Sequence, residues 1–350
     1  FIYTQTNKLK LNLDESGKTY IKGFVRGQFW TRYTDMNPGT TVNGEAVDQA
    51  FDFSIRRLRM GLSAQLSPKL YVYTMFGGNN LNQKNLNSTY QFLRVLDMNA
   101  EYEFSPEFSL GTGLSSWDGL SRWTTRASGS MMTLDAPLFS MLTVDKNDAL
   151  SRGLGAWIKG QVGKLDYVFS IKNPTTFGVA AKEGVVDYTL NHPSMRHSGY
   201  IKYEFFDDES NKSAYSGGTG TYLGKKKIFN FGVGYLMQAE MTSSLVSGVQ
   251  KNYDFKNWTA ELFYDAPLNK EKGTALTSYL GYFDTDFGPN YIRNVGANGF
   301  ADGGTSLNGA GSAFPMMGTG STIFYQLGYL MSKTKNVTQL QPNFAVQYSD

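Results

Sequence analysis

The chain has 350 residues, and its 33 lysine and arginine residues against 30 aspartate and glutamate residues leave a net charge of +3. This near balance provides no polyanion-binding surface, so nucleic acid is excluded as an expected partner. The chain has no cysteine, which excludes thiol catalysis, cysteine metal sites and disulfides. Its 38 glycines, 22 tyrosines and 24 phenylalanines against 10 prolines suit strands and turns better than helices.

The hydropathy pattern excludes a transmembrane helix, because no run of about 18 apolar residues occurs. The mean hydropathy of −0.35 resembles that of a soluble protein. A transmembrane barrel has a similar value, because each strand is apolar only at every second position. The chain opens at Phe1 without a basic and apolar leader, so if the protein is exported we expect its signal to have been removed.

The first predicted strand, residues 20–33, alternates between two kinds of side chain. One face carries Ile21, Gly23, Val25, Gly27, Phe29 and Tyr33, and the other carries Lys22, Arg26, Gln28 and Arg32. A period of two indicates a strand and not a helix. The strand is longer than the usual five or six residues and meets the roughly 9–11 residues that a tilted membrane strand needs.

Two predicted hairpins follow, 55–66 with 70–77 and 95–104 with 108–116, and both turn at Ser-Pro followed by a charged residue. The first strand of each hairpin has an apolar row, formed by Leu58, Met60, Leu62, Ala64 and Leu66 and by Leu96, Met98, Ala100, Tyr102 and Phe104. The opposing rows are polar: Arg57, Arg59, Ser63 and Gln65, and Asp97, Asn99, Glu101 and Glu103.

The remaining predicted strands are 154–162, 165–171, 199–206, 228–238, 258–265, 274–283, 322–330 and 340–348. Compact turns alternate with long polar loops, of which 35–50, 117–152 and 285–320 are the main ones. Short turns at one end and long loops at the other are typical of an outer-membrane barrel. The polar segment 207–227 is assigned to the short-turn end as an exception, with Asp207-Asp208-Glu209 as a surface turn.

The sequence therefore predicts one domain over residues 1–350, an all-β transmembrane antiparallel up-and-down β-barrel of the bacterial outer membrane. Its expected surroundings are outer-membrane lipid and lipopolysaccharide. The predicted strands are odd in number, whereas single-chain bacterial barrels have an even number. The chain also ends at Tyr348-Ser349-Asp350 without a terminal aromatic residue, so we expect C-terminal strands to be missing from it.

Short motifs resemble a known family. Residues 53–62, Phe-Ser-Ile-Arg-Arg-Leu-Arg-Met-Gly-Leu, resemble the second strand of the phosphate-selective porin O/P-like family. Gly119-Leu120-Ser121-Arg122 and residues 221–227 resemble its Bacteroidetes-type, Gram-negative members. The resemblance implies a 16-stranded barrel, with 14 strands as the alternative, which is often a homotrimer. It also implies a third extracellular loop folded into the pore, here residues 117–152.

If the apolar rows face lipid, the polar rows line the lumen. A basic wall then contains Lys22, Arg26, Arg32, Arg57 and Arg59, and an acidic wall contains Asp97, Glu101 and Glu103. Two interpretations stay open: a transverse field across a diffusion pore, or mutual neutralisation of the walls. The long loop would add Arg122, Arg126, Lys146 and Arg152 at a constriction, diluted by Asp135, Asp145 and Asp148.

Aromatic residues near the strand ends predict a girdle at the lipid–water interface, with a stacking platform for sugars or bases as the alternative. They are Tyr20, Phe29, Trp30, Tyr33, Tyr102, Phe104 and Phe108. The only histidines, His192 and His197, flank a proline and predict a solvated loop and not a catalytic triad. With no zinc-ligand spacing and no phosphate-binding glycine loop, we expect no enzyme and no cofactor.

The functional prediction is a porin through which small hydrophilic solutes and ions diffuse passively. An anion- or phosphate-selective channel is the first alternative, and a soluble all-β carbohydrate-binding protein is the second. A soluble protein would pack its apolar rows against each other, whereas a membrane barrel leaves them facing outward.

Overall fold

The computed structural model describes residues 9–86, 93–116, 119–124, 131–133, 135–144, 146, 152–190, 194–211, 220–302, 309–333 and 339–350. Fourteen strands pair in series in one sheet, and the short strand β11 (Asp187–Tyr188) pairs with β13 beside this series. No helix in these residues is long and apolar enough to cross a membrane.

The strands of the series follow the chain order. They are β1 (Lys10–Asn12), β2 (Tyr20–Asp35), β5 (Gln49–Gln65), β6 (Leu70–Leu81), β7 (Arg94–Ser105), β8 (Phe108–Ser115), β9 (Gly153–Val162), β10 (Leu165–Lys172), β12 (Arg196–Glu204), β13 (Ile228–Val246), β14 (Val249–Asn269), β15 (Thr274–Asp286), β18 (Gly320–Leu330) and β19 (Asn343–Ser349). Two small hairpins lie in loops: β3 (Thr41–Val42) with β4 (Glu45–Ala46), and β16 (Ile292–Val295) with β17 (Phe314–Gly318). A short helix, α1 (Gln83–Leu86), follows β6.

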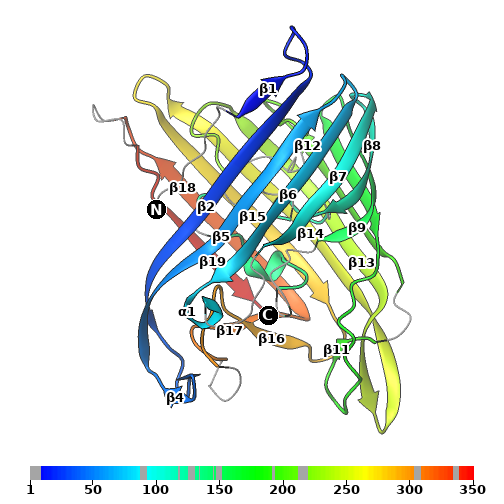
Figure 1. Cartoon of the computed structure of the whole chain (residues 1–350), viewed down its shortest axis with the longest axis vertical. Helices are drawn as coiled ribbons and strands as arrows, with labels where there is room; N and C mark the ends of the chain where they lie inside the picture. The colour runs from blue at the N-terminus through cyan, green and yellow to red at the C-terminus, as the bar shows by residue number, and fades with distance from the viewer. Residues whose placement is uncertain are drawn as a thin grey trace.

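Every pairing in the series is antiparallel, so the sheet is up-and-down, as predicted. The sheet also curves. In Figure 1, β2, β5, β6 and β7 cross the front with one slant, and β14 and β18 cross behind them with the opposite slant. Among the described residues, no pairing joins β19 to β1 or β2.

The two faces of the sheet have opposite character, and the apolar one is outside. Val25, Leu62 and Met98 are 50%, 48% and 66% exposed, whereas Arg59 and Asn99 on the same wall are buried. Buried polar and charged side chains outnumber buried apolar ones among the described residues. A soluble fold has the reverse arrangement, because it removes apolar surface from water. The predicted assignment of Leu62 and Met98 to the outer face is confirmed.

Two β-bulges interrupt the alternation and correct the predicted faces. In β5 the pairing with β2 skips Arg56, so Arg56 and Arg57 are both buried. In β7 the pairing with β6 skips Leu96, so Leu96 and Asp97 are both buried. A bulge adds one unpaired residue and shifts the side-chain alternation after it. The prediction that Leu96 lies in the outward row is therefore wrong; it packs with Tyr73 and Met75 on the inner face.

The β13–β14 hairpin is much longer than predicted. Its strands have 19 and 21 residues and continue through a bulge between Gln238 and Thr242 to a tight turn. Ser247 and Gly248 form this turn with φ angles of 55° and 77°, the positive values that a type I′ turn requires. The hairpin extends beyond its neighbours at the lower right of Figure 1.

The largest apolar cluster lies inside the curve of the sheet, on one side. Its wall residues come mainly from the inner faces of β13, β14, β15 and β18: Ile228, Leu236, Phe255, Phe263, Tyr279, Phe283 and Phe324. Residues 119–124 and 135–144, which follow β8, pack onto this wall through Leu120, Trp123, Leu138, Phe139 and Leu142. The Phe139 and Phe283 ring centroids are 5.0 Å apart, and those of Trp123 and Tyr279 are 5.1 Å apart.

Candidate functional site

The inner face of β2 and β5 carries the five residues of the predicted basic wall. Arg57 and Arg59 are buried, and Lys22, Arg26 and Arg32 are half-buried. Arg32 binds Asp52 at 2.9 Å and also donates to the backbone carbonyls of residues 297 and 298, at 3.1 and 2.9 Å.

The guanidinium groups of β5 have polar partners. Arg57 forms an ion pair with Asp135 and donates to Gln28 at 2.8 Å. Arg59 donates to the side chain of Asn79 and to two backbone carbonyls of β5 and β6. Since Asp135 belongs to the long loop after β8, this loop supplies the counter-charge for the wall.

Arg56 also lies on the inner face, a position that strict alternation does not predict. Its side chain is 1% exposed, and it contacts Asp135 at 2.9 Å and Asn80 at 2.7 Å. The sequence signal for this position is the pair of successive arginines. Strict alternation would place one of them among the outward apolar residues, so the pair indicates a bulge that turns both inward. Trp30 also lies on this inner face, with the guanidinium groups of Arg32 and Arg56 within 5.5 and 5.8 Å of its ring. Its predicted place in the girdle is therefore wrong.

The predicted acidic wall lies on β7, and its charges have partners on the following elements. Asp97 is buried and binds Arg152 at 3.1 Å. Glu101 binds Lys159 of β9 at 2.7 Å and accepts a hydrogen bond from the indole of Trp157 at 3.0 Å. Glu103 is half-buried on the same strand. Both walls thus find opposite charges nearby, from the long loop and from a neighbouring strand.

The basic residues of the long loop lie in three different places. Arg122 is fully buried, Lys146 binds Asp187 at 2.7 Å, and Arg152 binds Asp97 as described above. Arg126 lies outside the described residues, as do Asp145 and Asp148. The described part of the loop therefore spreads its cations over the inner face and does not gather them at one point.

A buried charged cluster that the sequence analysis missed surrounds Glu209. This carboxylate contacts the two terminal guanidinium nitrogens of Arg122, Nη2 at 2.9 Å and Nη1 at 3.2 Å, and the ammonium of Lys202 at 3.0 Å. Lys202 also binds Glu204 at 2.8 Å and Asp166 at 3.2 Å. Glu209 is 1% exposed, so the prediction of a surface turn at residues 207–209 is wrong for this residue.

Glu261 of β14 links this cluster to the apolar side of the interior. It accepts hydrogen bonds from the hydroxyls of Tyr200 and Tyr279, at 2.5 and 2.6 Å, and from the backbone N–H of Arg122 at 3.0 Å. The Arg122 guanidinium lies 3.5 Å from the centre of the Phe263 ring. The charges are held by several partners each, which is what burial of ionic groups requires.

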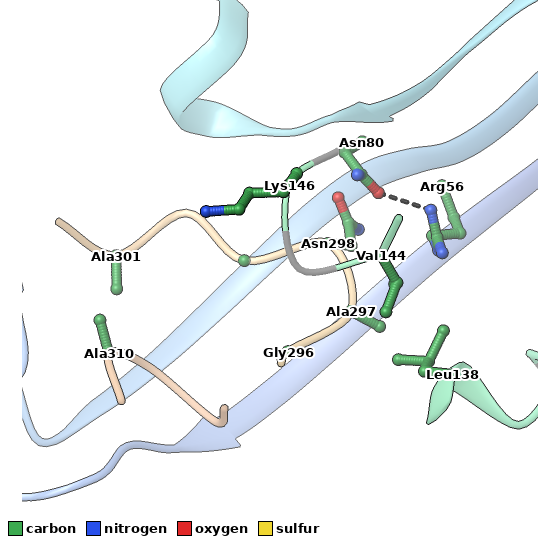
Figure 2. Close-up of a pocket in the computed structure, with 11 residues that line it drawn as sticks. Arg56, Asn80, Leu138, Val144, Lys146, Gly296, Ala297, Asn298, Ala301 and Ala310 are labelled. Carbon is green, nitrogen blue, oxygen red and sulfur yellow. Dashed lines mark hydrogen bonds between the residues drawn. The ribbon is translucent and has the colours of Figure 1, made fainter. Parts of the chain in front are cut away.

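A polar pocket of about 310 Å³ lies near the long-loop end. Figure 2 shows Arg56 hydrogen-bonded to Asn80 at one side of it and Ala301 and Ala310 at the other. The pocket lies between the strands β5 and β6, the long loop after β8 and the loop that contains residues 296–301. It is a recess of the inner face with room for a small polar solute or several waters.

The described residues give no catalytic constellation. No three histidine or acidic side chains among them are grouped to hold a metal ion. His197 is exposed on β12, and His192 lies outside the described residues. What the geometry offers is a polar and charged inner surface bounded by an apolar outer one, which can solvate a hydrophilic solute but shows no group placed to react with it.

No family model matches the chain, and no curated protein matches it. Among solved structures, the outer membrane channel DcaP of Acinetobacter baumannii aligns with 11% identity and a TM-score of 0.45, covering 94% of this chain and 79% of that one. OmpF of Salmonella typhi, in complex with daunomycin, aligns with 11% identity and a TM-score of 0.38 over 97% of this chain and 100% of that one. The anion-selective porin from Comamonas acidovorans aligns with 12% identity and a TM-score of 0.34 over 94% and 90%.

Proposed function

We propose that the protein is a bacterial outer-membrane porin through which small hydrophilic solutes and ions diffuse. The observation that carries this proposal is the inverted distribution of side chains, apolar outside and polar inside, around a curved antiparallel sheet. An apolar outer surface of this extent is unfavourable in water and favourable in hydrocarbon. The polar inner surface then lines a water-filled path.

Closure of the sheet into a barrel is part of the proposal. A sheet edge in hydrocarbon leaves backbone N–H and C=O groups without partners, at a cost of several kcal/mol for each group. We propose that the two edges of the described sheet, at β1–β2 and at β19, belong to one closed barrel. The family resemblance of the sequence implies a barrel of 16 strands and a homotrimer, as in the Bacteroidetes-type members of that family. Outer-membrane lipid and lipopolysaccharide are its proposed surroundings.

The long loop at residues 117–152 is proposed to narrow the lumen. Its support is the position of the described part of this loop, because Leu120, Trp123, Phe139 and Leu142 are buried inside the curve. A loop packed on one side of a barrel reduces the cross-section that is open to solute and sets the size limit.

An anion-selective channel is the second candidate function. Its support is the run of three buried arginines, Arg56, Arg57 and Arg59, on one stretch of β5. Their pairing with Asp135 and with polar side chains reduces the field that a passing anion would feel. We therefore place general diffusion first and anion selectivity second.

The test is reconstitution of the full chain in planar lipid bilayers and in liposomes. A porin gives discrete conductance steps and lets small sugars swell the liposomes, and its gel mobility changes on boiling. A reversal potential near zero in a salt gradient favours general diffusion, and a strong anion preference favours the second candidate. Protein that stays soluble without detergent and binds carbohydrate would overturn both in favour of a soluble all-β binding protein.

A further inference from the structure

Two chain segments that come from opposite ends of the sheet meet inside its curve. Residues 119–124 follow β8 and come from the long-loop end. Residues 207–211 follow β12 and come from the short-turn end, where the sequence analysis expected only surface. Arg122 and Glu209, one from each segment, are both 1% exposed and form an ion pair at 2.9 Å.

The first segment touches the wall with its backbone, at two glycines. A Cβ atom added at Gly234 of β13 would lie 2.1 Å from the carbonyl oxygen of Leu120. A Cβ atom added at Gly119 would lie 2.5 Å from the backbone of Gly199 in β12. The missing side chains of Gly234 on the wall and Gly119 on the segment allow this approach, and the backbone of Gly199 receives Gly119. We call the surface formed by Gly199 and Gly234 the glycine seat.

The seated conformation is strained. Leu120 has a φ angle of 132°, in a region that residues with a Cβ atom rarely adopt. Such a conformation persists only where the surroundings hold it in place. The side chain of Leu120 is buried in the apolar cluster. Arg122 follows, with its backbone N–H bonded to Glu261 and its guanidinium paired with Glu209.

Glu209 is itself fixed to the wall and not only to Arg122. Its carboxylate accepts hydrogen bonds from Asn230 of β13 and Tyr222, both at 2.6 Å. Its backbone N–H donates to Glu204 at 3.0 Å, and its carbonyl accepts from Gln161 at 2.7 Å. The residue therefore joins β9, β12 and β13 to the segment that occupies the glycine seat.

We propose that Glu209 is a positioning residue that sets the open cross-section of the channel by holding residues 119–124 on the glycine seat. This inference rests on the proposed function. It adds residues 207–211 as a second inward segment beside the long loop. Without the carboxylate, the charges of Arg122 and Lys202 are buried with fewer counter-charges, which is strongly unfavourable. Arg122 then moves toward the water of the lumen, the strained backbone at Leu120 relaxes, and residues 119–124 leave the wall and narrow the lumen.

The primary test is Glu209→Gln in the full chain, with Asp52→Asn as the matched control. Asp52 is also a buried lumen carboxylate paired with an arginine, Arg32, but it touches neither segment. We expect hydrogen exchange of residues 119–124 in detergent to become roughly a hundredfold faster in Glu209→Gln, the scale set by loss of one partner of a buried ion pair. In bilayers the single-channel conductance and the solute size limit should fall. Asp52→Asn should leave exchange of these residues unchanged.

A double variant separates positioning from general damage. If both residues act through one contact, Arg122→Gln combined with Glu209→Gln gives no larger change in exchange or conductance than Glu209→Gln alone. Additive changes in the double variant would overturn the assignment, and so would a folded Glu209→Gln protein with wild-type exchange and conductance.

A steric variant tests the seat without removing a charge. Gly234→Ala places its new methyl group against Leu120 and pushes the segment off the wall. It should also speed exchange of residues 119–124 and lower conductance, even where Glu209→Gln fails to fold. Gly23→Ala is the control, because a Cβ atom there has 3.5 Å to its nearest neighbour. Unchanged exchange in Gly234→Ala would overturn the inference. Wild-type protein without conductance, but with the exchange changes intact, would reject the porin and retain the anchoring role of Glu209.

Discussion

The two halves of the inner face differ in what covers them. From β2 to β10 most buried inward side chains are polar or charged, such as Arg57, Asn99 and Lys159, and the apolar ones form two small clusters. From β13 to β18 many are aromatic, such as Phe255, Phe283 and Phe324, and residues 119–124 and 135–144 pack on them. The outer faces of both halves are apolar. The half from β13 to β18 therefore supports the internal segments. The half from β2 to β10 presents the polar surface along which the proposed solute path runs.

The largest expected effect on stability comes from a substitution in the aromatic inner face of the half from β13 to β18. Phe283→Ala removes a ring that is 1% exposed and packs edge-on against Phe139. A Phe→Ala change in a packed interior costs about 3–5 kcal/mol, because it leaves a cavity. We expect this loss in the free energy of unfolding, measured by urea titration of protein folded in lipid vesicles. Phe29→Ala, at an outward position, is the control and should cost clearly less; equal losses would contradict the comparison.

The outer face, which the halves share, gives the next largest effect. Met60→Lys places a charge on the proposed lipid side and should cost about 2–4 kcal/mol if the site is near the middle of the bilayer. Leu58→Lys and Ala100→Lys should behave in the same way. Asn99→Lys, on the inner face, should be tolerated and should change the conductance instead. Equal stability of Met60→Lys and Asn99→Lys in the same urea titration would show that the faces are assigned wrongly.

The polar half predicts a change in selectivity. Asp135→Asn removes the carboxylate that pairs with both Arg56 and Arg57. The added net positive charge should favour anions, raising the anion-to-cation permeability ratio by roughly two- to threefold. The reversal potential in a salt gradient measures this ratio. Asp254→Asn is the control, because Asp254 is exposed and its side chain accepts a hydrogen bond from the backbone N–H of Glu240. A similar shift in this variant would point to a non-specific surface effect.

How far the sequence could predict this structure also differs between the halves. In β2, β5 and β7 a single polar face makes the period of two visible. The predicted bounds of β2 and β7 lie within two residues of the observed ones, whereas β5 begins six residues earlier than predicted, at Gln49. In β14 both Leu262 and Phe263 are apolar although one is outside and one inside, so the sequence does not separate the faces. Only contact with the internal segments explains why an inner face is aromatic there, and such long-range contacts leave no local pattern.

The inward residues that follow regular alternation could be predicted from the sequence, whereas those at β-bulges and in loops could not. Arg57, Arg59, Asp97 and Glu101 follow from alternation, whereas Arg56 and Leu96 depend on bulges. A bulge is a property of the pairing between two strands, and one strand's sequence indicates it only weakly. Glu209 was missed because a polar segment rich in acidic residues has the composition of a surface turn. Its burial depends on Arg122, which lies 87 residues earlier in the chain.

The smallest predicted effect concerns the loops that join the halves at the long-loop end. Asp302, beyond β16, accepts hydrogen bonds from the backbone N–H of Gly44 at 2.8 Å and the hydroxyl of Thr41 at 3.1 Å. The bond from Gly44 is the main cause that lowers the pKa of Asp302 below its ordinary value of 3.8. A lowered pKa in the folded state means that the carboxylate stabilises this junction above about pH 4, and that this stabilisation is lost as the pH falls through the folded-state value.

Protection of the Gly44 amide against hydrogen exchange, corrected for the intrinsic rate, should therefore fall when the pH is lowered from about 5 toward about 3, the range in which a carboxyl group titrates. The change should be small, because the junction is open to solvent and screened by it. Asp302→Asn cannot titrate, so its Gly44 amide should show a constant protection over this range. A wild-type protein with equally constant protection would mean that Asp302 does not hold the two halves together through its charge, and that the backbone bond from the N–H of Asp302 to the carbonyl of Thr41 suffices.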